Sequence, residues 1–135
     1  MPEKVKIKFA LFLPAVAWFV ITIILMTLPG SDIPQNDFLT LIYFDKWVHI
    51  GMFAVLVILT GMPFLKAKAA NRNLFLRIAL AAICYGVAME FVQKFLTTDR
   101  SFEIWDITAD AAGSFAGYFI LFNRHKKNLK AKVSE

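Results

Sequence analysis

Near its start the chain carries twenty consecutive residues, Phe9 to Leu28, without a charged side chain. A helix of about 20 apolar residues is long enough to cross the hydrocarbon core of a bilayer. Lysines precede this run, as they do in a signal peptide. However, the run is longer than a typical signal-peptide core, and "LMTLPGS" offers no small-residue cleavage site. We therefore expect a retained membrane-spanning helix at residues 9–28.

Three further apolar segments follow, at residues 47–65, 74–96 and 106–122. The chain is 59% hydrophobic and 19% charged, which is too apolar for an ordinary soluble domain. A soluble helical bundle would need a polar face along each helix, and the first two segments have none. We expect one all-α domain over the 135 residues, an integral-membrane four-helix bundle. The fourth segment is the weakest, because its uncharged part spans only 111–122.

The basic residues are distributed unevenly among the segments that connect these spans. Twelve of the fifteen lie before the first span, between the second and third, or after the fourth. The other three are Lys46, Lys94 and Arg100. Because lysine and arginine accumulate in cytoplasmic loops, we predict that both termini are cytoplasmic. The net charge of +5 follows from this bias and suits anionic inner-leaflet lipid, so we expect no nucleic-acid partner.

The acidic residues are predicted to lie on the opposite side of the membrane. All but Glu3 and Glu135 fall in outer loops or in the outer half of a span: Asp32, Asp37, Asp45, Glu90, Asp99, Glu103, Asp106 and Asp110. Lys46, Asp99 and Glu103 are each compatible with ordinary solvated loop charges. The acids inside the spans need another explanation.

Two of the predicted spans carry ionisable or amide side chains at a similar distance from their outer ends. Asp45 and His49 are four residues apart, at the start of the second span, and share one helix face. Glu90 and Gln93 are three residues apart in the third span, where Glu90 lies about six residues, or ~9 Å, inside the outer end. These positions predict a polar constellation near the outer surface.

The fourth segment contributes Asp106 and Asp110, which are four residues apart and share one face. Gly113 and Gly117 extend that face as "GSFAG", a small-xxx-small pattern that allows another helix to approach and that by itself indicates packing. An unpaired ionisable group inside a membrane costs several kcal/mol, so a ligand or reaction site is the first hypothesis. The alternative is a structural network in which His49 and Arg100 neutralise the buried acids.

The ordered set "DKWVHIGMF", "EFVQKFL", Arg100 and "DITADAAGSFAG" resembles the VanZ-like family of small bacterial membrane proteins. The resemblance covers roughly residues 29–117. It implies a four-helix protein of the bacterial cytoplasmic membrane and a link to resistance to teicoplanin, a lipid-tailed glycopeptide. An acid at position 110, where relatives often carry asparagine, suits a cation or proton site better than a neutral hydrogen-bonding site.

We expect a cell-envelope protein with a polar pocket at the outer leaflet that binds or modifies a lipid headgroup. A lipid-linked cell-wall precursor is one such lipid. The candidate acids and bases are His49, Glu90, Asp106 and Asp110. The candidate residues for holding a phosphate or carboxylate headgroup are Lys46 and Arg100, with Asp45 and Gln93 beside them.

Two other functions stay open, and with them the question whether the protein is an enzyme. One is a non-catalytic structural or partner-binding membrane protein. The other is a small proton-coupled transporter, which the absence of an inverted repeat disfavours. The aspartates and His49 could also hold a divalent cation, although their spacing matches no standard metal motif. The sequence does not identify a cofactor. The single cysteine, Cys84, is predicted to be a small packing residue.

Overall fold

A computed structural model describes residues 7–29, 38, 43–67 and 69–133, and these residues form helices and connections without a β-strand. The described helices are η1 (Phe9–Phe12), α1 (Leu13–Thr27), α3 (Phe44–Lys66), α4 (Arg72–Leu96) and α5 (Ile104–Val133). The all-α prediction is confirmed for this part of the chain. The predicted features at Lys4, Lys6, Asp32, Asp37 and Lys68, and at both chain termini, lie outside the described residues.

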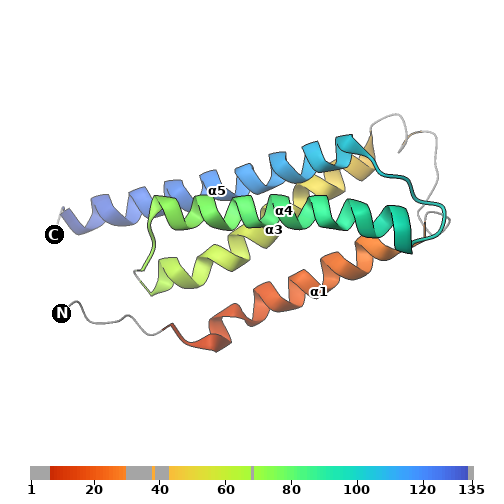
Figure 1. The fold of residues 1–135 in the computed structure, drawn as a ribbon. Coiled ribbons are helices and arrows are strands. Elements are labelled where there is room, and N and C mark those ends of the chain that lie inside the picture. The colour runs from red at the N-terminus through yellow and green to blue at the C-terminus, as the bar shows by residue number, and fades with distance from the viewer. Residues whose placement is uncertain (1–6, 30–37, 39–42, 68, 134–135) are drawn as a thin grey trace.

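The long helices run side by side in alternating directions (Figure 1). α3 finishes, α4 begins and α5 finishes at one end, which we call the basic end. α3 and α5 begin, and α4 finishes, at the opposite end, which we call the polar end. The polar residues singled out above therefore come together from three helices at the polar end.

Three helical segments are long and apolar enough to cross a membrane: Phe9–Thr27, Phe44–Lys66 and Arg72–Leu96. This supports a multi-pass membrane protein. α5 does not qualify, because Asp106 and Asp110 occupy its first turns and basic residues follow from Arg124 onward. A fourth span at 106–122 therefore remains a prediction.

α5 packs closely against α3 through its small residues. A Cβ on Gly113 would overlap the carbonyl oxygen of Ile50, and a Cβ on Gly117 would lie 2.7 Å from the carbonyl oxygen of Ala54. The predicted small-xxx-small contact is thus present between α5 and α3. Around it lie fully buried apolar side chains from three helices: Phe53, Val57, Phe75, Ala79 and Leu121.

α1 is held to the other helices by a few polar contacts, while much of its surface is exposed. These contacts are Trp18 Nε1 to Met52 O at 3.0 Å, Thr22 Oγ1 to Tyr85 OH at 3.0 Å, and Gln93 Nε2 to Met26 O at 2.9 Å. Leu13, Phe19 and Ile24 are among its exposed side chains. In a membrane this apolar surface would face lipid.

The structure differs from the sequence predictions at two places. α5 continues to Val133, well past the predicted end at residue 122. The apolar pattern indicates only the part of a helix that would lie in hydrocarbon. The charged residues that follow are good helix formers, so the helix continues through them. Cys84 is exposed on α4, so its assignment as a packing residue was wrong. A lipid-facing position accepts a small apolar thiol as readily as a core does.

Candidate functional site

Three helices bring four ionisable side chains into the interior at the polar end. His49 comes from α3, Glu90 from α4, and Asp106 and Asp110 from α5; we call them the acid–histidine cluster. Glu90 and Asp110 are 0% exposed, and His49 and Asp106 are 5% exposed. The acids of α5 share the helix face that carries Gly113, and this face is turned toward α3 by the glycine contact.

His49 and Asp110 form the central pair of the cluster. His49 Nδ1 lies 2.8 Å from Asp110 Oδ1, and the contact is fully buried. An ionised carboxylate only accepts hydrogen bonds, so His49 donates from Nδ1 when Asp110 is charged. The other ring nitrogen, Nε2, lies 4.0 Å from Asp106 Oδ2. The imidazole is thus held by one aspartate, with its second nitrogen near another.

Lys46 lies at the outer edge of the cluster and is surrounded by carboxylates. Its Nζ is 2.7 Å from Asp45 Oδ2, 2.7 Å from Glu103 Oε2, and in direct contact with Asp106 Oδ1. The same three carboxylates are close enough together to hold a metal ion. However, the ammonium group of Lys46 already supplies a positive charge among them. A divalent ion would have to displace it, so these residues favour an ion-pair network over a metal site.

Glu90 joins the cluster to the beginning of α5. Its Oε2 accepts a hydrogen bond of 2.9 Å from the backbone N–H of Glu103, directly before the first residue of α5. A carboxylate is favoured at a helix N-terminus, because the backbone N–H groups there lack helical partners and carry partial positive charge. Glu90 also interacts electrostatically with Asp106, His49 and Asp110.

Several buried polar atoms of the cluster and of the α4–α5 connection have no hydrogen-bond partner among the described residues. They are Glu90 Oε1, Asp110 Oδ2, Ser114 Oγ and Arg100 Nε. Buried polar groups are nearly always satisfied in native proteins, so each such atom calls for a proton, a water molecule or a ligand. Asp110 Oδ2 lies against Gly86 of α4, where a Cβ would be only 2.5 Å away.

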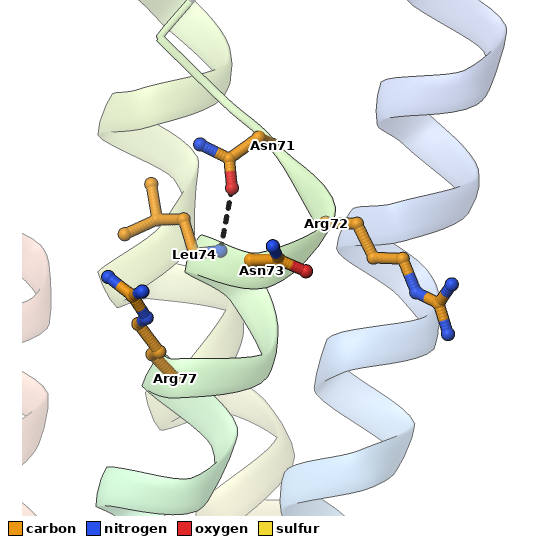
Figure 2. Close-up of a pocket in the computed structure, with 5 residues that line it drawn as sticks. All are labelled: Asn71, Arg72, Asn73, Leu74 and Arg77. Atoms are coloured by element: carbon orange, nitrogen blue, oxygen red, sulfur yellow. Dashed lines mark hydrogen bonds between the residues drawn. The ribbon is translucent and has the colours of Figure 1, made fainter.

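The predicted site residues do not all have the predicted surroundings. His49, Glu90, Asp106 and Asp110 lie in one buried cluster, whereas no described contact brings Arg100 into it. The predicted acid and base roles of these residues stay predictions. Gln93 instead donates to the carbonyl of Met26, near the C-terminal end of α1, where helical carbonyls lack internal partners. Among the described residues Arg100 has no ion pair with Glu90. The described groove, lined by Asn71, Arg72, Asn73, Leu74 and Arg77, lies at the basic end (Figure 2).

Three residues of this region were not identified from the sequence. Glu103 was interpreted as a loop charge, yet it contacts both Lys46 and Glu90. Both contacts depend on how α3 and α4 pack against the start of α5, and its place in the sequence does not indicate them. Gly86 and Ser114 stand four residues from Glu90 and Asp110, on the same helix faces, and this spacing is the only sign of them in the sequence.

The fold and the site define a class of protein: a helical protein with three segments of membrane-spanning length and a buried acid–histidine cluster at one end. No family model matches the chain, and neither a curated protein nor a solved structure is significantly similar to it.

Proposed function

We propose that the chain is a VanZ-like membrane protein of the bacterial cell envelope, whose acid–histidine cluster binds or modifies the headgroup of an outer-leaflet lipid. The observation that carries this proposal is the fully buried pair of His49 and Asp110 beside the unpartnered Glu90 Oε1. Burying these charges costs stability, and a purely structural pairing would leave no carboxylate oxygen unsatisfied.

The arrangement suits proton transfer. Asp110 holds the imidazole of His49 at Nδ1, which orients the ring, while Nε2 remains the nitrogen that exchanges a proton with a substrate. Glu90 supplies a second buried carboxyl group whose Oε1 is unpaired. An acid and a base in one buried site can protonate a leaving oxygen and deprotonate a nucleophile on a headgroup.

The charges around the cluster indicate what the headgroup carries. Lys46 is already bound by three carboxylates, so it is a poor candidate for binding a phosphate. Arg100 is the better candidate, because its buried Nε has no partner among the described residues. The free carboxylate oxygens of Glu90 and Asp110 call for hydrogen-bond donors. A phosphorylated headgroup with hydroxyl or amino groups, as in a lipid-linked wall precursor, has both features.

The distribution of charge supports placing the polar end outside the cell. Most of the basic residues that the structure describes belong to the basic end: Lys8, Lys66, Arg72, Arg77, Arg124, Lys126, Lys127, Lys130 and Lys132. The positive-inside rule then assigns the basic end to the cytoplasm. Both chain termini would be cytoplasmic, and the acid–histidine cluster would lie at the outer leaflet.

A second candidate function is a non-catalytic structural role. Gln93 fastens α4 to α1, and Lys46 joins α3 to α5 through Asp106 and Glu103. These contacts show that some of the polar residues connect helices. The two roles predict different effects when a residue of the cluster is substituted. If the role is structural, the protein becomes less stable. If the residue belongs to a binding site, the protein binds less ligand.

The test of the proposal is lipid retention. Native mass spectrometry of the purified protein would identify co-purifying lipid for the wild type, His49→Gln and Arg100→Ala. We expect a phosphorylated lipid on the wild type and at least a tenfold smaller bound fraction on Arg100→Ala. Lys94→Ala is the matched control, because Lys94 is an exposed cation at the same end. Equal retention by Arg100→Ala and Lys94→Ala would refute the assignment of Arg100.

A second test measures the biological effect. Inhibitory concentrations of teicoplanin and vancomycin would be compared in a susceptible bacterium expressing the wild type or Arg100→Ala. A drug anchored by an acyl chain resides in the same layer as the proposed site, so its inhibitory concentration should shift more than that of the tailless drug. Equal shifts for both drugs, or an undiminished shift with Arg100→Ala, would contradict the proposed site.

A further inference from the structure

The basic end of the bundle carries cations without neutralising acids. The described acids, from Asp45 to Asp110, all belong to the polar end or to the α4–α5 connection beside it. Each described ion pair involves Lys46 or His49, which are also at the polar end. The positive charge at the basic end is therefore not compensated within the described part of the chain.

Two of these cations are held beside the same aromatic ring. The guanidinium carbon of Arg72 lies 5.9 Å from the centroid of the Phe122 ring, and Lys126 Nζ lies 5.2 Å from it. Arg72 Nε donates to the hydroxyl of Tyr118 at 3.3 Å, which fixes the position of the guanidinium between α4 and α5. The ring attracts each cation weakly but does not neutralise it. The terminal nitrogens of Arg72 remain available to a further acceptor.

A groove of about 480 Å³ lies next to this pair of cations, at the start of α4, and shares only Arg72 with it. Figure 2 shows Arg72 extending from this turn toward α5, while Arg77 extends to the other side of α4. Asn71 caps the helix by accepting from the N–H of Leu74 at 2.8 Å. The partial positive charge of a helix N-terminus adds to the attraction of anions here.

The length of α5 places these residues at the depth of lipid phosphates. Its 30 residues extend about 45 Å, whereas the hydrocarbon core is about 30 Å thick. The apolar part of α5 closes with Phe122, and exposed basic residues follow from Arg124. Arg72 and Lys126, which both lie beside that ring, are therefore placed where hydrocarbon gives way to headgroups.

We infer that Arg72 and Lys126 bind the phosphate of an anionic phospholipid, with Phe122 against its glycerol backbone and the groove at the start of α4 accommodating its headgroup. The charge of the basic end, the ring-held pair of cations and the depth of the site all select a negatively charged lipid. This site is separate from the acid–histidine cluster at the other end and does not depend on its proposed function.

The test uses the full chain in detergent and native mass spectrometry with two lipids of identical acyl chains, phosphatidylglycerol and phosphatidylcholine. We expect phosphatidylglycerol to bind more tightly. Arg72→Gln and Lys126→Gln should each weaken its binding about fivefold, and the double variant about twentyfold. Lys127→Gln is the matched control, since it removes an equal charge one residue away, from an exposed side chain for which no ring contact is described.

Three results would overturn the inference. Equal affinities for the two lipids would show that the site does not select charge. An equal loss with Lys127→Gln and Lys126→Gln would show a diffuse basic surface instead of a site. Displacement of the lipid by inorganic phosphate at an equal concentration would show that the ligand is free phosphate. Arg72 and Lys126 are exposed, so these variants should fold, and thermal unfolding of each would verify this.

Discussion

Asp110 Oδ2 lies so close to the backbone of Gly86 that a Cβ at position 86 would stand 2.5 Å from it. The contact joins α4 to α5 at a charged atom of the acid–histidine cluster. Gly86 is thus as much a part of the site as the side chains themselves, because any larger residue would move Asp110 and its hydrogen bond to His49.

The first prediction follows from this contact. Gly86→Ala should push Asp110 away from α4 and lower the free energy of unfolding by about 1–3 kcal/mol, the usual cost of overpacking. Gly51→Ala is the control, because a Cβ there meets nothing within 4 Å. It should be neutral or stabilising by up to about 1 kcal/mol through helix propensity. Thermal unfolding in detergent distinguishes them; equal effects would contradict the contact.

The second prediction concerns Glu90. In Glu90→Gln the amide oxygen can still accept from the N–H of Glu103, and the buried charge is gone. We expect a thermal midpoint at or above that of the wild type and a loss of lipid retention and of the drug phenotype. Retained function would rule Glu90 out as a site residue. A lower midpoint would instead favour the structural role.

The third prediction tests the coupling of His49 and Asp110. His49→Phe leaves a buried carboxylate without its partner and should destabilise the protein by about 3–5 kcal/mol. Adding Asp110→Leu removes the isolated charge, so the double variant should be more stable than His49→Phe alone. A double-mutant cycle on unfolding free energies should give a coupling of about 1–3 kcal/mol. Additive effects would show that the 2.8 Å contact contributes nothing.

The fourth prediction is the orientation in the membrane. Asn73 and Ser101 are exposed positions near opposite ends of α4. With the exposed Cys84 replaced by alanine, an impermeant thiol reagent outside intact cells should label Ser101→Cys and leave Asn73→Cys unlabelled. The reverse pattern would invert the topology and place the acid–histidine cluster in the cytoplasm.

The helices and the cluster could be predicted from the sequence where they depend on residues that are close together in the chain. An uncharged run long enough for a bilayer predicts a span, and a four-residue spacing places Asp106 and Asp110 on one face. The register between helices is not local. Two contacts depend on how α4 and α5 are placed along each other. One brings Gly86 of α4 against Asp110, and the other brings the Glu103 N–H, just before α5, to Glu90.

The role of Lys46 illustrates the same limit. Only Asp45 is its neighbour in the chain, whereas Glu103 and Asp106 reach it from the start of α5. The sequence therefore left Lys46 free to bind a phosphate. The structure shows that its charge is already paired with three carboxylates, and this leaves Arg100 as the proposed phosphate contact.

The polar character of α5 has a consequence for how the protein is assembled. In the proposed arrangement α3 and α4 can each partition into lipid unaided, whereas α5 brings two aspartates that the insertion machinery disfavours. The residues that receive those aspartates, Lys46, His49 and Gly86, are all synthesised earlier. In this arrangement the residues that contact Asp106 and Asp110 are made before α5, so we expect α5 to insert last, against α3 and α4. A substitution of Lys46 would then act during membrane insertion. α5 would stay outside the bilayer in some chains, and proteases would degrade those chains.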